Sequence, residues 1–234
     1  VPGGLARHRA TRALVRAASL GMVDHLALRT AAIDRVVRHA VEDGATQVVI
    51  LGAGLDTRAW RLGLRDVKVF EVDHPDTQQR KRRLAPSDGA PEYVSVDFGK
   101  ERVGDALDAA PSFDSNACTV WVWEGVTMYL PAVAVAETLA QVADRSAPGS
   151  TLAMTYLSTA GVPVPKLVDA AFDGLFGEAL ESRYTPADVQ RLLATYRFEV
   201  IEDHNSNGWD RDWGGNPRLA GILRAERLVV GVRT

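Results

Sequence analysis

The stretch VVILGAGLDTRAW (48–60) places an apolar run directly before two glycines, Gly52 and Gly54, that one residue separates. When a strand is followed by such a turn and then by a helix, the backbone of the turn can approach a ligand closely, because glycine has no Cβ. The dinucleotide-binding fingerprint has a third glycine three positions after the second, where Thr57 stands here. Asp56 adds negative charge where a helix N-terminus would receive a phosphate. The turn predicts a nucleotide-like ligand other than NAD or FAD, with a ligand-free tight turn as the alternative.

Length and composition favour one ordinary α/β domain over residues 1–234. The formal net charge of -3 gives no electrostatic attraction to nucleic acid or anionic membranes, and no stretch has the ~20 apolar residues of a membrane span. A single cysteine, Cys118, excludes an internal disulfide, and no cysteine and histidine spacing resembles a zinc site. We therefore expect a cytoplasmic monomer or homodimer with no nucleic-acid or membrane partner and no metal.

Seven β-rich runs alternate with helical stretches, which predicts a mostly parallel sheet with helices on both faces. The runs are 47–51, 67–72, 92–96, 118–123, 150–157, 197–203 and 227–232. A polar, Gly-rich segment joins the last two, so we expect these two strands to pair antiparallel. Residues 158–184 are longer and more apolar than an ordinary connection, which predicts a lid-like insertion.

Helices are predicted from apolar spacing and capping residues. Residues 1–44 read as N-terminal helices, because apolar residues from Ile33 onwards recur at the i, i+3 and i+4 spacing of one helix face. Another helix is predicted with Pro131 in its first turn. Thr185 and Asp188 form the Ser/Thr-x-x-acid pattern of a capping box, which predicts where a later helix begins.

An acid near the end of the second run suits a nucleoside. In VFEVDHP, Glu71 and Asp73 lie on the same side of the predicted strand, and a carboxylate at this distance after a glycine turn accepts from ribose hydroxyls. We favour Asp73, because it lies nearer the open end of the strand. The alternative is that either acid is simply paired at the surface with Lys68 or Arg80.

Acids also follow the next two runs. Asp97 and Phe98 stand side by side after the third, a combination suited to binding a purine amino group and covering the purine face. Glu124 follows the fourth run, with Gly125 next to it. Because the carboxyl ends of parallel strands meet at one edge of a sheet, these acids are predicted to converge there.

In this order and spacing, LGAGLDTRAWRL, VFEVDHP, VDF and EGVTMYL resemble the leucine carboxyl methyltransferase family, including its bacterial branch of S-adenosylmethionine-dependent O-methyltransferases. The resemblance implies a Rossmann-like class I methyltransferase fold, with a seven-stranded, mostly parallel sheet and a reversed last strand pair. It also implies S-adenosyl-L-methionine as the cofactor. The cofactor contacts that it implies are Gly52, Ala53, Gly54, Asp73, Asp97, Phe98 and Glu124.

The family resemblance also concerns arginines. Family members carry an arginine in the helix before the glycine turn that pairs with the cofactor carboxylate, and Arg29 matches it; a guanidinium suits a carboxylate, and an exposed helix charge is the alternative. A further basic residue of the family has no clear counterpart, although Arg7 or Arg12 could serve. Arg58 matches the bacterial branch rather than the eukaryotic protein-carboxyl methylators, which favours a small-molecule acceptor over a protein.

Several side chains are candidates for the acceptor side. Arg58 could orient an anionic substrate or bind a neighbouring acid, and Asp56 could cap the helix or face the ammonium of the cofactor. Tyr129 and Tyr156 could line the acceptor pocket or be core aromatics. His74 is a weak candidate for a base, with a surface or structural role as the alternative. A carboxylate acceptor is already ionised at neutral pH and needs no base.

The sequence therefore predicts an O-methyltransferase acting on a carboxylate or hydroxyl of a small molecule, such as a polyketide or another secondary metabolite. Two alternatives remain. One is a nicotinamide-dependent oxidoreductase on a similar sheet, which the missing third glycine opposes. The other is a protein that binds S-adenosylmethionine without catalysis.

Overall fold

A computed structural model describes residues 19, 21–98, 100–159, 179–209, 216–220 and 223–234. The strands are β1 (Gln47–Leu51), β2 (Lys68–Asp73), β3 (Glu92–Ser95), β4 (Thr119–Trp123), β5 (Thr151–Leu157), β6 (Phe198–Asn205) and β7 (Glu226–Arg233). The described helices are α2 (Met22–Glu42), α3 (Arg58–Arg61), α4 (Pro75–Leu84), α5 (Val103–Asp108), the 3-10 helix η1 (Thr127–Tyr129), α6 (Ala132–Asp144), α8 (Pro186–Thr195) and α9 (Pro217–Ala220).

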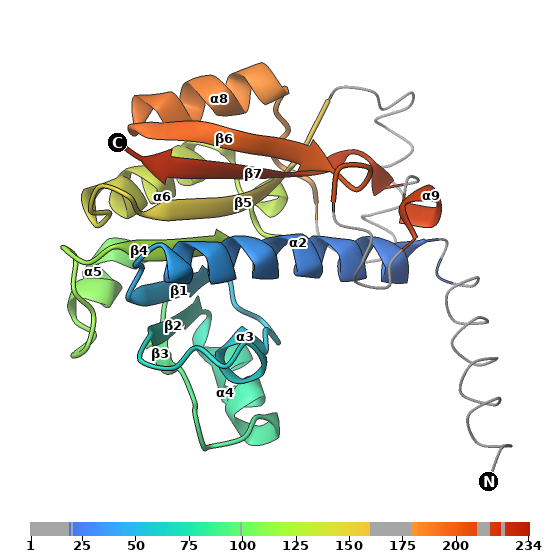
Figure 1. Ribbon diagram of the computed structural model, residues 1–234. Coiled ribbons are helices and arrows are strands. Elements are labelled where there is room, and N and C mark those ends of the chain that lie inside the picture. The colour runs from blue at the N-terminus through green and yellow to red at the C-terminus, as the bar shows by residue number, and fades with distance from the viewer. Residues whose placement is uncertain (1–18, 20, 99, 160–178, 210–215, 221–222) are drawn as a thin grey trace, which may run out of the picture.

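The strands form one seven-stranded sheet in the order β3-β2-β1-β4-β5-β7-β6 (Figure 1). The pairs β1–β2, β1–β4, β2–β3 and β4–β5 are parallel, whereas β7 is antiparallel to both β5 and β6. The predicted mostly parallel sheet with antiparallel pairing of its last two strands is confirmed.

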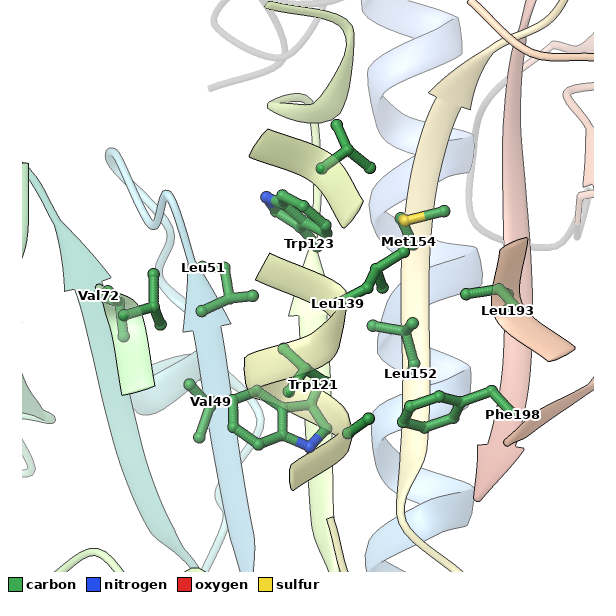
Figure 2. Packing of buried hydrophobic residues seen from close by; sticks show 14 of the residues in the cluster. Val49, Leu51, Val72, Trp121, Trp123, Leu139, Leu152, Met154, Leu193 and Phe198 are labelled. Atoms are coloured by element: carbon green, nitrogen blue, oxygen red, sulfur yellow. The ribbon is translucent and has the colours of Figure 1, made fainter. Parts of the chain in front are cut away.

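Apolar residues of the central strands alternate between two cores, one on each face of the sheet. Val49 and Leu51 belong to the core that α5, α6 and α8 cover, whereas Val48 and Ile50 belong to the core beneath α2 and α9. Figure 1 shows α2 lying along its face of the sheet, and Figure 2 shows the opposite core, in which Trp121 and neighbouring side chains pack beneath α6. Every residue of β1, β4 and β5 is buried, as expected for strands with both faces covered.

The helix signals in the sequence hold to within a residue or two. The capping box is present, because Thr185 Oγ1 accepts from the Asp188 backbone N–H at 3.1 Å and the Thr185 N–H donates to the Asp188 carboxylate at 2.9 Å. Pro131 stands at the N-cap of α6 rather than inside its first turn. The helix after the glycine turn is shorter than a phosphate-binding helix, since α3 has only 4 residues.

Parts of the predicted organisation fall outside the described residues. These are residues 1–18 and 20 of the N-terminal segment, which include Arg7 and Arg12, and residues 160–178 of the predicted lid. Among the described residues, no helix is long and apolar enough to cross a membrane, and no group of three or more His, Cys, Asp or Glu side chains is placed to hold a metal ion.

Candidate functional site

Four acids gather at the edge of the sheet where the parallel strands end. Asp73 is the last residue of β2, Asp97 lies two residues beyond β3, and Glu124 directly follows β4. Glu226 is the first residue of β7 and pairs with Leu157, the last residue of β5, because β7 runs in the opposite direction. The predicted convergence of three strand-end acids is present, and Glu226 adds a fourth that the sequence analysis missed.

The glycine turn packs tightly on one side and is open on the other. Gly52 and Gly54 have φ values of 65° and 49°, in the left-handed region that favours glycine. A Cβ built on Gly52 would collide with the Val126 side chain, whereas one on Gly54 would meet nothing within 4 Å. The Gly54 N–H donates to the Asp73 carboxylate, so the turn and the β2 acid are held together at the open side.

A cavity of about 290 Å³ lies between this turn and α2. Its lining includes Arg29, Gly52, Ala53, Asp56, Arg58 and Glu124. The structure thus brings four of the predicted cofactor residues to one cavity, which also contains the motif residues Asp56 and Arg58. Phe98 instead lines a second cavity of about 250 Å³ together with residues of α6.

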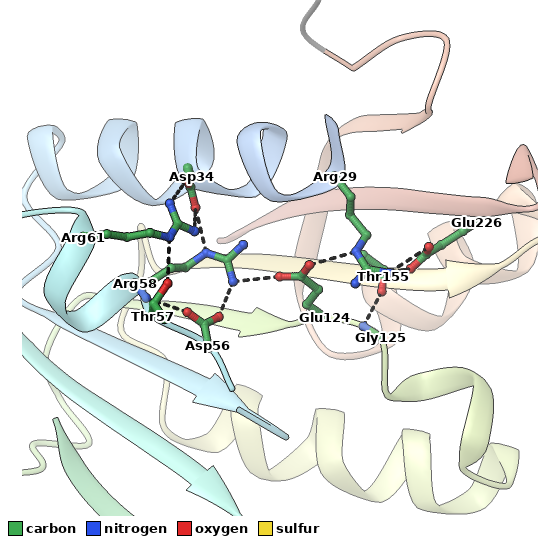
Figure 3. Close-up of polar contacts among 10 residues, drawn as sticks. All are labelled: Arg29, Asp34, Asp56, Thr57, Arg58, Arg61, Glu124, Gly125, Thr155 and Glu226. Carbon is green, nitrogen blue, oxygen red and sulfur yellow. Dashed lines mark hydrogen bonds and ion pairs between the residues drawn. The ribbon is translucent and has the colours of Figure 1, made fainter. Parts of the chain in front are cut away.

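Arg58 is buried at the centre of an ionic network (Figure 3), with only 2% of its side chain exposed. Its Nε donates to Asp34 at 2.8 Å, and its Nη1 binds Glu124 at 2.7 Å and the Asp56 carboxylate. Burial alone would lower the pKa of Arg58, but the charges of Glu124, Asp56 and Asp34 outweigh it and raise the pKa above its ordinary value. Of the two roles considered for Arg58, the geometry supports binding neighbouring acids rather than orienting a substrate.

Arg29 forms the second half of this network (Figure 3). Its Nε donates to Glu124 at 2.8 Å, and its Nη1 donates to both oxygens of Glu226 at 2.8 and 2.9 Å. Glu124 therefore bridges Arg29 and Arg58. Only 16% of the Arg29 side chain is exposed, which opposes the alternative of a solvated helix charge.

Glu226 is stabilised as a carboxylate. Burial by itself would raise its pKa, but the charge of Arg29 and a hydrogen bond from His25 outweigh burial and lower the pKa to about 2. His25 Nε2 lies 2.5 Å from Glu226 Oε2, and the histidine is 2% exposed. Neither His25 nor Glu226 was among the predicted site residues.

The structure separates the two acids that competed for the ribose position. Glu71 is fully buried and pairs with Lys81 at 2.5 Å, so its carboxylate already has a partner inside the fold. Burial raises the pKa of Glu71 to about 7, although Lys81 opposes the shift. Asp73 is half-buried at the sheet edge, and its Oδ1 accepts from the His74 backbone at 2.6 Å. The position of Asp73 therefore suits a ribose, and its partner is the glycine turn rather than Lys68 or Arg80.

Asp97 and Phe98 lie where the resemblance places an adenine. Asp97 is partly exposed and accepts from Lys100 Nζ at 2.6 Å. Phe98 is half-buried and packs against the core beneath α6. Their roles toward a purine remain predictions.

One acceptor candidate is corrected by its position. Tyr156 is fully buried in β5, where its hydroxyl donates to Asp203 at 2.7 Å and accepts from Arg227 Nε at 3.1 Å. Burial, with the charge of Asp203, raises the pKa of Tyr156. Tyr156 is therefore a core aromatic and lines neither of the two cavities described above, whereas Tyr129 is half-buried in η1 and stays a candidate.

His74 occupies a structural position. Its Nδ1 accepts from the Asp76 backbone N–H at 3.3 Å, which makes it the N-cap of α4, and 47% of its side chain is exposed. A base role for His74 would require giving up this cap. The arrangement fits the structural alternative.

Comparisons with known proteins agree with this geometry. The family model described as leucine carboxyl methyltransferase matches residues 4–143. A Mycolicibacterium gilvum protein, provisionally named an S-adenosyl-L-methionine-dependent methyltransferase, is 36% identical over 216 residues, which cover 88% of this chain and 64% of that protein. A Mycolicibacterium paratuberculosis protein with the same provisional name is 37% identical over 209 residues, covering 81% and 62%. The chain thus spans less than two thirds of the length of these relatives.

A solved structure shares the fold. The crystal structure of a Thermobifida fusca YX protein, provisionally named a methyltransferase, matches with a TM-score of 0.72 at 23% identity, covering 92% of this chain and 83% of that chain. The predicted class I methyltransferase fold is confirmed by this likeness and by the strand order.

Proposed function

The chain belongs to the leucine carboxyl methyltransferase family, and on this premise we propose that it is an S-adenosyl-L-methionine-dependent O-methyltransferase. The proposed acceptor is a carboxylate or hydroxyl of a small molecule, such as a polyketide or another secondary metabolite. One observation carries the proposal. The glycine turn, the strand-end acid Glu124 and the arginines Arg29 and Arg58 line one cavity at the carboxyl edge of the sheet.

The residues at this edge fit the chemistry of the proposed cofactor. Gly54 offers backbone with open space above it, and Asp73 beside it offers carboxylate oxygens for ribose hydroxyls. Glu124 and Asp56 supply negative charge for an ammonium and a sulfonium, while Arg29 supplies a guanidinium for a carboxylate. Each charged part of the cofactor thus has a complementary side chain in the lining.

S-adenosylmethionine held by these residues would supply an activated methyl group, bonded to a positively charged sulfur, for transfer to an acceptor oxygen. The contribution of the protein is to align the two reactants and exclude water. A carboxylate acceptor is ionised well below neutral pH, whereas a hydroxyl needs a base or an unusually low pKa. The family description, with its carboxyl acceptor, favours the first.

Ligand binding tests the proposal first. Millimolar S-adenosylmethionine or S-adenosylhomocysteine is expected to raise the melting temperature, since a ligand bound only to the native state stabilises it. NAD is expected to have no effect. A shift with NAD alone would point to an oxidoreductase, and no shift with either sulfur compound would defeat the proposal.

Turnover tests the rest. Incubation with methyl-labelled cofactor and a panel of carboxylic acids and phenols is expected to label at least one acceptor, and binding without any transfer would favour a non-catalytic protein. For a carboxylate acceptor, the rate is expected to stay nearly constant from about pH 6 to 9. A steep rise across neutral pH would indicate a hydroxyl instead.

A further inference from the structure

We infer that Glu226 and His25 are positioning residues for cofactor binding: they fix the Arg29 guanidinium so that its Nη2 is left to hold the cofactor carboxylate at the cavity that Arg29 lines. This inference rests on the proposed function. Neither residue lines the cavity itself, so both act through Arg29.

The acids bind Arg29 on two different nitrogens. Glu124 accepts from Nε, and both oxygens of Glu226 accept from Nη1. Among the described residues no side chain accepts from Nη2. The guanidinium is planar and its donors diverge in a fixed fork, so fixing Nε and Nη1 also fixes the direction of Nη2.

The backbone at Gly125 lies next to the Arg29 guanidinium. A Cβ built on Gly125 would lie 3.6 Å from Nη2 and 3.8 Å from Nη1 of Arg29, so the backbone of this turn lies close beside the guanidinium. Gly125 has a φ of 70°, and its N–H donates to Thr155 Oγ1 at 2.8 Å. The turn after β4 is therefore anchored in a conformation that glycine favours, next to Glu124 in the cavity wall.

His25 fixes Glu226 in turn. Its Nε2 donates to Glu226 Oε2 at 2.5 Å, and its ring packs against Trp209 with centroids 5.1 Å apart. The other ring nitrogen, Nδ1, is buried and has no hydrogen-bond partner among the described residues. Because Glu226 is the one polar partner of this buried ring within that part of the chain, we assign His25 the role of orienting that carboxylate.

The competing effect is electrostatic. Glu226 carries a negative charge next to the site where a ligand carboxylate would bind, so it could weaken rather than assist that binding. Orientation and repulsion predict opposite signs when Glu226 is removed. We expect the orienting effect to dominate, because Arg29 without Glu226 keeps a carboxylate only on its Nε side and becomes free to rotate.

A matched pair of ligands separates the two. S-adenosylhomocysteine carries the carboxylate, whereas its decarboxylated analogue keeps the ammonium and the nucleoside but lacks that group. We expect Glu226→Ala and His25→Phe to weaken binding of S-adenosylhomocysteine roughly tenfold, the loss of one charge-assisted hydrogen bond. Binding of the decarboxylated analogue should change less than twofold, and His25→Gln, which can still donate, should recover most of the loss.

Calorimetric dissociation constants for both ligands give the result, with His39→Phe, an exposed histidine of the same helix, as the control. Equal weakening of both ligands would mean a purely structural role and overturn the inference. Tighter S-adenosylhomocysteine binding would show that Glu226 competes with the ligand, with the same consequence. If Glu226→Ala does not fold, Glu226→Gln replaces it. Wild-type protein that binds both ligands equally refutes the inference alone, whereas protein that binds neither refutes the proposed function.

Discussion

Replacing Arg58 with methionine should destabilise the protein strongly, because Arg58 neutralises three carboxylates inside the fold. Asp34 is 4% exposed, Asp56 9% and Glu124 15%. Asp34 would keep Arg61, and Glu124 would keep Arg29. Asp56 would lose its side-chain ion pair, so at least one nearly buried charge would be left uncompensated.

The magnitude follows from that uncompensated charge. Removing one partner of a buried ion pair costs about 3–5 kcal/mol, because the remaining charge keeps its desolvation penalty without the attraction. Arg58→Met keeps the length of the side chain but removes the guanidinium. We therefore expect the free energy of unfolding to fall by about 3 kcal/mol or more, which corresponds to roughly 10 °C in melting temperature for a chain of this size.

Urea denaturation of both proteins at neutral pH measures this difference. The control is Arg102→Met, which breaks a surface pair with Asp105 whose partners are 69% and 71% exposed. An exposed pair contributes about 0–1 kcal/mol, so this control should unfold nearly like the wild type. If Arg58→Met costs no more than Arg102→Met, the network is not a buried electrostatic unit and our account of Arg58 is wrong.

Three further predictions concern single positions. Gly52→Ala should cost more stability than Gly54→Ala in urea denaturation, because both have positive φ but only the Cβ at Gly52 meets Val126; equal costs would contradict the tight packing. The free energy of unfolding of the wild type should fall by about 3 kcal/mol as the pH is lowered from 4.5 to about 2, and Glu226→Gln should not show this fall. The sign follows because the native pKa of Glu226 lies below its unfolded value, so the unfolded state binds more protons in that window; an unchanged acid profile would refute it. Tyr156→Phe should lower stability by about 1 kcal/mol, the loss of a buried hydrogen bond, and leave S-adenosylhomocysteine affinity unchanged; a selective loss of affinity would return Tyr156 to the site.

Much of the fold was predictable because its strands and the helices α2, α6 and α8 have local signals in the sequence. Apolar runs of strand length mark β1, β4 and β5, whose residues are buried on both faces, and Thr185 with Asp188 marks the start of α8. The antiparallel pairing of β6 and β7 was predicted from the polar, Gly-rich segment that joins these two strands. These signals come from residues that are close together in the chain, so they can be recognised in a single sequence.

The site was predictable only in part, because half of it depends on contacts between distant segments. Asp73 and Glu124 end parallel strands, and a strand end can be read from the sequence. Glu226 begins a strand, and it reaches the same edge only because β7 runs backwards beside β5. An acid at the start of the reversed strand was the available signal. Tyr156 is a further case, since its hydroxyl donates to Asp203 of β6, a residue far away in the sequence.

The ionic network explains why the glycine turn suits a cationic ligand better than a phosphate. The network contains three arginines, Arg29, Arg58 and Arg61, and four acids, Asp34, Asp56, Glu124 and Glu226. With His25 left out of the count, it therefore has one acid more than it has arginines. A pyrophosphate would add two negative charges beside this excess, and the short helix α3 offers little dipole to offset them. A sulfonium and an ammonium instead bring positive charge to the acids, while one carboxylate is left for Arg29. In other proteins the same edge of the sheet binds dinucleotides. Here its charges suit S-adenosylmethionine, and the negative charge of Asp56, where a neutral turn residue could stand, contributes to this difference.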